Sequence, residues 1–201
     1  SSRPRPSSCC RSRRPRRRRF RPQTGGRGLF ASQPFQPGQP VLVFTGPVLD
    51  HAEVLALGEK QGYALRIGPD EYLDTIPPGR YTNHSCDPNA GIMNDRVLIA
   101  LRPIVTGEEI RFDYSTTMSE NHWTMECRCG EPFCRRVILD FHHLPPIAQN
   151  RYLQLGVVQH FIVDQVRRRE NKTLKAVGDE RLVGSKQLWL FHPQNLSHKR
   201  K

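Results

Sequence analysis

The stretch YTNHSCDPNA, residues 81–90, decides how the rest of this sequence is interpreted. Residues 83–86 are four consecutive polar or reactive side chains, and residues 87–89 place turn-forming types directly behind them. Such a run is typical of a backbone segment held rigid for a binding or catalytic site. A lone Asn-His-Ser also occurs in ordinary surface loops, so the interpretation depends on the segments that accompany it.

Net charge is distributed unevenly along the 201 residues. Residues 1–22 carry ten Arg and no acid, and residues 167–201 carry ten Lys or Arg against three acids. The body, residues 23–166, therefore has a net charge of −5, although the whole chain has +12. An acidic body attracts a cationic ligand such as a Lys/Arg-rich peptide and repels nucleic acid. No apolar run approaches the ~20 residues of a membrane-spanning helix, so we expect no membrane contact.

Hydrophobic patterning predicts a β-rich domain followed by helices. Short apolar runs at 40–50, 63–74 and 95–104 each read as a strand with a turn signal, and their spacing differs from that of βαβ units. One short helix is expected at 51–60, closed by Gly58. Two amphipathic helices are expected further along the chain, at 144–156 and 157–171.

Four of the six cysteines lie in the acidic body. Cys127, Cys129 and Cys134 fall within eight residues in the loop CRCGEPFC. Three thiolates leave a tetrahedral zinc ion one ligand short, and Cys86 is the remaining cysteine of the body. In an intracellular chain a zinc site is more common than two disulfides. The sequence therefore predicts a metal ion that ties a late loop to the centre of the domain, with unpaired cysteines as the alternative.

Residues 26–31, GRGLFA, match the dinucleotide-binding pattern Gly-x-Gly-x-x-Ala. That motif needs an apolar strand before it and a helix after it. Here polar residues precede it, and the three prolines of residues 32–40 exclude a helix. We therefore reject a dinucleotide site and infer that these glycines let the backbone come close to a ligand or a neighbouring strand.

Taken in order, GRGLFA, NHSCDPN, GEEIRFDY (107–114) and CRCGEPFC resemble the SET-domain protein lysine methyltransferases with a cysteine-rich post-SET segment, over roughly residues 25–136. The resemblance implies a β-rich (α+β) SET fold of short strands with a knot-like crossing at NHSC, a zinc-bound post-SET loop and C-terminal helices. We expect these parts in order: a disordered Arg-rich tail (1–22), the SET domain (23–114), the post-SET zinc loop (115–136), a helical segment (137–170) and a basic tail (171–201).

The resemblance also assigns site residues. It implies that S-adenosylmethionine lies against these positions: Arg27, Gly28, Leu29, Asn83, His84 and Tyr114. Tyr114 matches the catalytic tyrosine of the family. The zinc ligands of the family match Cys86, Cys127, Cys129 and Cys134. Taken singly, each of these residues has an ordinary structural interpretation; the side chain of Arg27 in particular is left open between a surface cation and a ligand contact.

The expected chemistry suits these residue types. Free Lys has a pKa of about 10.4, and an apolar channel beside a sulfonium cation lowers that value so that the amine can attack. A tyrosine hydroxyl at Tyr114 orients the amine without adding a charge. Phe112, two positions earlier, leaves room beside the amine, which in the family accompanies the addition of two or three methyl groups.

The sequence departs from the family pattern at two positions. Phe44 stands where many members have a tyrosine, which removes a hydroxyl near cofactor and substrate and puts rate or methylation state in doubt. Arg136 stands where a glycine is common after the last cysteine. Tyr63 and Tyr81 are both candidates for a further aromatic wall, and Tyr63 is assigned to the substrate channel with Phe44 and Phe112.

The expected function is methyl transfer from S-adenosylmethionine to a lysine of a basic protein, possibly histone-like, with zinc as the second cofactor. One alternative is an inactive SET-derived peptide-binding module. Another is a zinc-stabilised nucleic-acid-binding protein that uses the basic tails, since residues 1–22 suit weak nucleic-acid contact. An intracellular location is expected, nuclear in a eukaryote or cytoplasmic in a bacterium. The sequence gives no oligomeric state.

Overall fold

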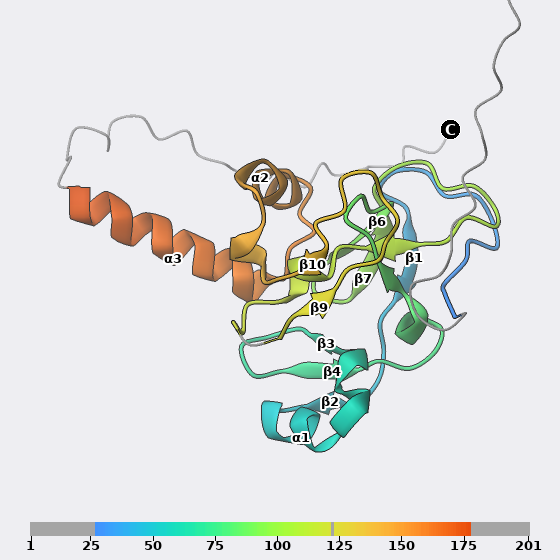
Figure 1. The fold of residues 1–201 in the computed structure, drawn as a ribbon, viewed down its shortest axis with the longest axis horizontal. Coiled ribbons are helices and arrows are strands. Elements are labelled where there is room, and N and C mark those ends of the chain that lie inside the picture. The colour runs from blue at the N-terminus through green and yellow to red at the C-terminus, as the bar shows by residue number, and fades with distance from the viewer. Residues whose placement is uncertain (1–26, 122, 178–201) are drawn as a thin grey trace, which may run out of the picture. The chain divides into compact units, whose positions relative to one another are not determined.

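The structure is a computed structural model that describes residues 27–121 and 123–177 (Figure 1). It divides into two compact units, residues 1–162 and 163–201, and each is described by itself. The predicted tail at 1–22 lies outside the described residues, as does most of the predicted tail at 171–201. None of the described helices is long and apolar enough to cross a membrane.

The described strands of the first unit form two three-stranded sheets and two two-stranded pairs, which confirms the prediction of a β-rich α+β fold built from short strands. The first sheet has the order β1-β7-β6, and all its pairs are antiparallel. Its strands are β1 (Pro40–Val43), β6 (Ala90–Met93) and β7 (Val97–Ala100). The main core lies on this sheet, where Leu98, Ala90 and Ala100 are fully buried.

The second sheet has the antiparallel order β2-β4-β3. Its strands are β2 (Val48–Leu49), β3 (Ala64–Arg66) and β4 (Tyr72–Asp74). The run 40–50, expected to be one strand, is thus split between two sheets at Gly46. A Cβ at Gly46 would lie 2.0 Å from the Asp74 carbonyl oxygen, and its φ of +151° also favours glycine. The run 63–74 likewise contains two strands rather than one.

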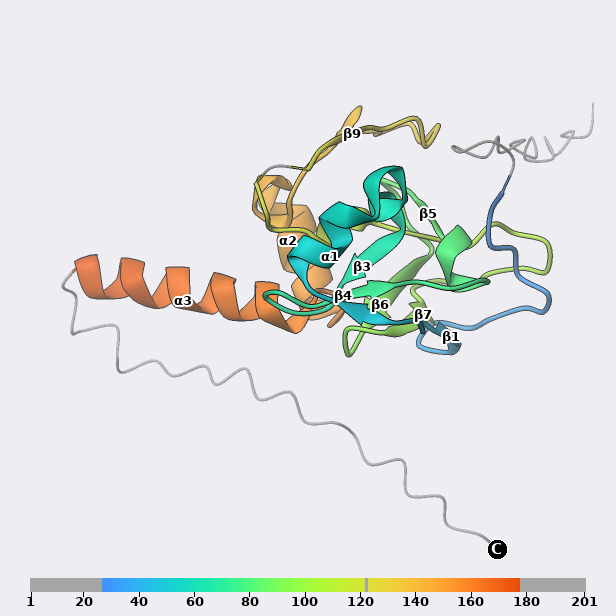
Figure 2. The same ribbon diagram turned by 90° about the horizontal axis from the view of Figure 1, so that it is seen from below.

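Helix α1 (His51–Ala56) begins at a capping box. Asp50 accepts from the Glu53 N–H, while the Glu53 side chain accepts from the Asp50 N–H. The helix is shorter than the expected 51–60, because a 3₁₀ turn at Gly58–Tyr63 follows it and leads into β3. Helix α1 packs beside β4 (Figure 2).

Strands β5 (Asn83–His84) and β8 (Arg111–Phe112) form a parallel pair. The register joins Asn83 to Arg111 and His84 to Phe112, and the Ser85 N–H donates to the Phe112 carbonyl at 3.0 Å. Two of the sequence motifs, NHSC and GEEIRFDY, are therefore neighbours in space. A 3₁₀ turn at Tyr114–Thr117 follows β8 directly.

The segment after this turn forms a hairpin of β9 (Met125–Glu126) and β10 (Val137–Ile138), which encloses the CRCGEPFC loop. Helix α2 (Pro146–Gln154) begins with proline, and Gly156, with a φ of +66°, follows its end. Both features were predicted. Helix α3 (His160–Val177) continues past the expected end at residue 171, because no glycine or proline interrupts it there.

Candidate active site

The opening glycine segment lies against the end of the GEEI motif. The Phe30 backbone bridges to Glu109, and a Cβ on Gly28 would lie only 2.7 Å from the Glu109 Oε1 atom. Position 28 therefore has no room for a side chain. The Asn83 side-chain amide joins the two segments, since its Nδ2 donates to the Arg27 carbonyl at 3.0 Å and to Glu109 Oε1 at 2.7 Å. Residues from three distant motifs thus meet in one place.

His84 is 1% exposed and holds the backbone of Tyr114. The Tyr114 N–H donates to His84 Nδ1 at 3.1 Å, so Nδ1 is an acceptor and the ring proton is on Nε2, which faces the Cys86 sulfur at 3.4 Å. Asp113 Oδ1 lies 3.5 Å from the same Nδ1. Because Nδ1 already accepts a hydrogen bond, that approach is not an ion pair. Burial lowers the pKa of His84 to about 4 despite the nearby Asp113 carboxylate, which agrees with a neutral ring.

The side chain of Tyr114 is fixed at both ends. Its hydroxyl donates to the Thr82 carbonyl at 2.9 Å, and its ring lies 4.9 Å from the Phe112 ring, centroid to centroid. The Phe112 ring in turn meets Phe44 edge to face at 6.2 Å. Burial raises the pKa of Tyr114 well above its ordinary value, so the hydroxyl is neutral. Gly79 allows this packing, since a Cβ there would lie 2.9 Å from the Phe44 ring.

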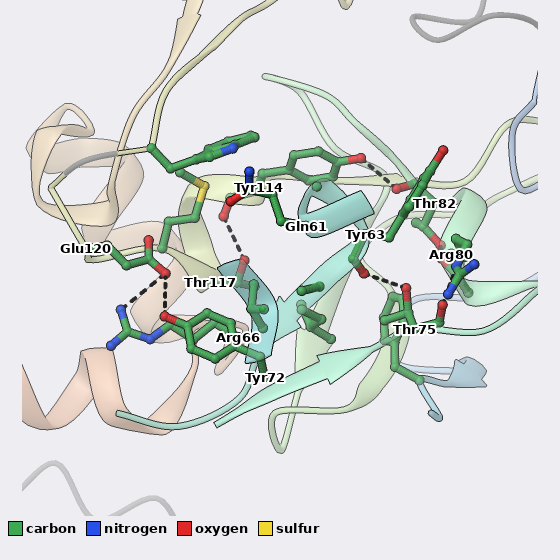
Figure 3. A pocket seen from close by; sticks show the side chains of 18 of the residues that line it. Gln61, Tyr63, Arg66, Tyr72, Thr75, Arg80, Thr82, Tyr114, Thr117 and Glu120 are labelled. Carbon is green, nitrogen blue, oxygen red and sulfur yellow. Dashed lines mark hydrogen bonds and ion pairs between the residues drawn. The ribbon is translucent and has the colours of Figure 1, made fainter. Parts of the chain in front are cut away.

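These aromatic rings border a pocket with roughly 880 Å³ of space, part of it open to solvent (Figure 3). All three residues predicted for the substrate channel line it: Phe44, Tyr63 and Phe112. Tyr114 lines it as well. Tyr63 therefore borders this pocket, whereas Tyr81 is not among the residues that line it.

Polar groups gather on two sides of this pocket (Figure 3). On one side Arg66 lies 3.3 Å from Glu120, and the Tyr72 hydroxyl donates to the same carboxylate at 3.4 Å. On the other side the Arg80 guanidinium lies 5.2 Å from the centre of the Tyr63 ring. In Figure 3 the aromatic ring of Tyr114 lies between the charged groups of Arg66 and Glu120 on one side of the pocket and Arg80 on the other.

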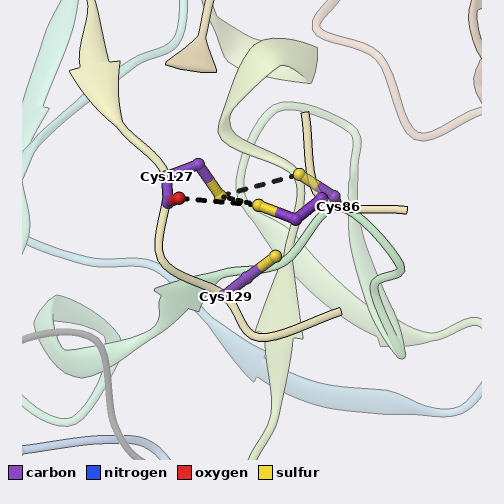
Figure 4. A group of neighbouring side chains, drawn as sticks. Cys86, Cys127 and Cys129 are labelled. Atoms are coloured by element: carbon purple, nitrogen blue, oxygen red, sulfur yellow. Dashed lines mark hydrogen bonds between the residues drawn. The ribbon is translucent and has the colours of Figure 1, made fainter. Parts of the chain in front are cut away.

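The four cysteines predicted to bind zinc converge (Figure 4). The Cys86 and Cys127 sulfur atoms are 3.6 Å apart, those of Cys127 and Cys134 are 3.5 Å apart, and all four, including Cys129, lie within 4.8 Å of one another. A tetrahedral zinc ion with Zn–S bonds of about 2.3 Å places its ligands about 3.8 Å apart. The residues present therefore fit a zinc ion in both geometry and donor chemistry.

Two ion pairs, one buried and one partly buried, attach the cysteine loop to β8 and to the residue that follows it. Arg111 of β8 donates to Glu131 at 2.7 Å and to the Cys129 carbonyl at 3.2 Å. Arg135, directly after Cys134, donates to Asp113 at 2.7 Å. Asp113 is 1% exposed and also accepts from the Tyr152 hydroxyl at 3.0 Å.

Sequence reasoning missed three buried polar residues of this site, Glu109, Asp113 and Tyr152, and the partly buried Arg135. The first two stand inside GEEIRFDY, and Arg135 follows the last cysteine, so their positions in motifs were a usable signal. For Tyr152 the sequence held no such signal apart from its place in an amphipathic helix. Among the predicted cofactor residues only Tyr114 lines the pocket, and the other five are not among the residues that border it. Arg27 is exposed and donates to the Tyr81 hydroxyl at 3.2 Å, and Leu29 packs against the core.

Arg136 occupies a backbone conformation that favours glycine. Its φ is +68°, in the left-handed region, and its carbonyl accepts from the Cys127 N–H at 2.6 Å. Although arginine replaces the glycine common in the family, the Cys127–Arg136 hydrogen bond still closes the cysteine loop, and Arg136 adopts a strained backbone conformation there.

We compared the sequence with protein-family models and with known proteins. The family model described as "SET domain" matches residues 26–115, which confirms the resemblance and the fold that the motifs predicted. Histone-lysine N-methyltransferase trr of Drosophila melanogaster is 31% identical over 128 residues, which are 55% of this chain and 5% of that protein. An H3 lysine-36 specific histone-lysine N-methyltransferase of Mycosarcoma maydis is 30% identical over 148 residues, which are 62% of this chain and 15% of that protein.

Among solved structures, KRYPTONITE in complex with mCHH DNA, H3(1-15) peptide and SAH is similar, with 22% identity and a TM-score of 0.45 over 56% of this chain and 27% of that chain. This chain thus spans only a small part of the length of the proteins it resembles.

Proposed function

Residues 26–115 are a SET domain, and from that premise we propose that this protein transfers methyl groups from S-adenosylmethionine to the side-chain amine of a lysine in a basic protein. One observation carries the proposal. The pocket bordered by Phe44, Phe112 and Tyr114 is joined through Tyr114 to the segment that holds Asn83, because Tyr114 donates to the Thr82 carbonyl and to His84 Nδ1. Asn83, between those two residues, donates to the Arg27 carbonyl and to Glu109.

S-adenosylmethionine is the cofactor that a SET domain implies, and when bound it supplies an electrophilic methyl group on a sulfonium. The residues that would hold it are the backbone of 27–29 with the side chains of Asn83 and His84. These residues suit the task because Gly28 leaves its backbone without a side chain, and Asn83 and His84 are fixed by hydrogen bonds to neighbouring motifs.

The pocket residues would prepare the lysine for attack. A lysine that enters the pocket beside the Phe112 and Tyr114 rings leaves water, and burial without a counter-charge lowers its pKa from about 10.4 toward neutrality. Tyr114 is itself neutral, because burial raises its pKa. Its hydroxyl and the Thr82 carbonyl would therefore orient the amine rather than remove its proton. The contribution of the protein is alignment and exclusion of water.

The four converging cysteines would hold a structural zinc ion. A closed set of four thiolates has no open position for substrate, so the metal would support the fold and take no part in methyl transfer. Its effect would be to fix the loop 127–134 to the segment after His84, through Cys86.

Phe112 supports the addition of more than one methyl group. Its ring lies directly against Tyr114, and it lacks a hydroxyl that would hold water beside the amine. We propose that the enzyme goes beyond monomethyl-lysine. Phe44, which replaces a tyrosine of the family, packs edge to face on Phe112 and is 3% exposed, so it acts as an apolar wall.

A histone-like protein is the substrate class that we propose. The body of the chain has a net charge of −5, which favours a Lys/Arg-rich peptide. The curated relatives are named histone-lysine N-methyltransferases, and KRYPTONITE was solved with an H3 peptide. The nucleic-acid alternative depends on residues 1–22, which lie outside the described residues.

The test is incorporation of labelled methyl groups into mixed histones. We expect the intact protein to label a histone, Tyr114→Phe to lose most of the label, and Ile147→Ala to keep it, because Ile147 is 85% exposed on α2. Cofactor binding is measured on the same samples by calorimetry. Binding without labelling would support the inactive-module alternative, and the absence of both would refute the enzyme proposal.

A further inference from the structure

The buried carboxylate of Asp113 joins three segments that are distant in the sequence. Its Oδ1 accepts from Arg135 Nη2 at 2.7 Å and from the Ser115 N–H at 3.1 Å, and its Oδ2 accepts from the Tyr152 hydroxyl at 3.0 Å. Arg135 belongs to the cysteine loop and Tyr152 to α2. Asp113 itself stands between Phe112 and Tyr114, the residues at the centre of the pocket.

This carboxylate depends on its partners. It is 1% exposed, and a buried charge without a counter-charge and hydrogen bonds is costly. Arg135 provides the counter-charge. Tyr152 is 4% exposed and remains a hydrogen-bond donor, because burial and the neighbouring carboxylate raise its pKa. Loss of the Tyr152 hydroxyl leaves Oδ2 without its hydrogen bond, and loss of Arg135 leaves the carboxylate without its counter-charge; in either case the carboxylate must then move.

Any such movement reaches Tyr114 through the backbone. Asp113 caps the 3₁₀ turn that starts at Tyr114, since its side chain accepts from the Ser115 N–H. The Tyr114 N–H points at His84, and its hydroxyl points at the Thr82 carbonyl. The position of this ring is therefore set by the peptide that Asp113 anchors, and methyl transfer is sensitive to displacements of about 1 Å.

We propose that Tyr152 of α2 and Arg135 of the cysteine loop are positioning residues for Tyr114, and that they act through the carboxylate of Asp113. The helix after the cysteine loop is then part of the catalytic apparatus rather than a support behind it. The inference rests on the proposed methyl transfer only for its kinetic consequence; the positioning itself is independent of any reaction.

The test compares Tyr152→Phe, which removes one hydroxyl and keeps the ring, with Ile92→Val. Ile92 is 1% exposed in the main core and its side chain makes no hydrogen bonds, so Ile92→Val controls for a general loss of stability. The first measurement is hydrogen exchange of the Tyr114 backbone amide by NMR, with the Leu98 amide as an internal reference. We expect exchange at Tyr114 to accelerate about tenfold or more in Tyr152→Phe, while Leu98 changes no more than in the control.

The second measurement is steady-state kinetics together with zinc content. We expect kcat to fall about tenfold or more in Tyr152→Phe, with KM for cofactor and peptide within about twofold and zinc content unchanged. Arg135→Lys should retain more activity than Arg135→Gln, because lysine keeps the charge beside Asp113. Unchanged exchange at Tyr114 in Tyr152→Phe would overturn the proposal whatever the activity. Faster exchange in a protein that methylates nothing would support the positioning and refute the enzyme proposal alone.

Discussion

Replacement of Cys86 by serine is the sharpest test of the zinc proposal. Cys86 is the one member of the cysteine cluster that lies outside the loop 127–134, so a metal ion bound by all four thiolates would join that loop to the NHSC segment through Cys86. The sulfur–sulfur distances of 3.5 and 3.6 Å are close to the ~3.8 Å of a tetrahedral thiolate site. Serine at this position would leave three thiolates and an open coordination position.

The expected loss follows from the energy of such sites. Structural zinc binding contributes about 10–16 kcal/mol, so one ligand of four accounts for ~3 kcal/mol, which is about two orders of magnitude in zinc affinity. In the metal-free protein burial raises the pKa of the Cys86 and Cys127 thiols, that of Cys127 to about 11, so both are protonated at neutral pH. Zinc must displace those protons, and its affinity should therefore fall steeply as the pH is lowered.

The assay is metal content by mass spectrometry, followed by competition with a chromophoric chelator. Wild type should carry one zinc ion per chain, and Cys86→Ser should lose it to the chelator at a concentration about a hundredfold lower. Cys9→Ser makes the same chemical change outside the cluster and should behave as wild type. Equal retention of zinc by Cys86→Ser and wild type would refute the four-thiolate site, and so would a wild-type protein that binds no zinc.

Four further outcomes are expected. Phe112→Tyr should shift the product toward monomethyl-lysine in mass spectra of a methylated peptide, because the new hydroxyl lies beside Tyr114. Asn83→Ala removes two hydrogen bonds of 2.7 and 3.0 Å between motifs and should weaken cofactor binding about tenfold or more in calorimetry. Arg136→Gly should leave stability equal or raise it by up to ~1 kcal/mol in urea titrations, since it relieves a φ of +68°. Burial raises the pKa of Tyr114, so the unfolded chain ionises first above about pH 10 and the free energy of unfolding should fall there, less steeply in Tyr114→Phe.

The sequence was sufficient to predict the family, the β-rich fold and the clustering of the cysteines, because each depends on residue types at fixed local spacing. CRCGEPFC brings three thiols together by its own geometry. The residues at which strands begin and end were harder to predict from the sequence. Gly46 and Pro47 were visible in the run 40–50, yet nothing local shows that the Asp74 carbonyl comes so close to Gly46 that the run must divide between two sheets.

Partners of buried polar groups could not be predicted for a related reason. The pattern of α2 places Tyr152 on the packed side of a helix, but the carboxylate it reaches is decided by how that helix lies on the domain. The same holds for Arg135, whose position after Cys134 gives no sign that its guanidinium turns inward to Asp113. Such contacts join residues that are adjacent only after the whole unit has folded.

Phe44 is the strongest support for the inactive-module alternative, and its surroundings argue against that alternative. The ring is 3% exposed and lies edge to face on Phe112. Gly79 provides the space it needs, since any side chain there would collide with the ring. The position is therefore a packed apolar wall, and the hydroxyl found elsewhere in the family is replaced without leaving a void. Tyr114, by contrast, keeps its hydroxyl directed at the Thr82 carbonyl. The substitution removes one polar contact from the pocket and leaves the aligning group in place, which favours an enzyme with altered rate or product over a domain that has lost its chemistry.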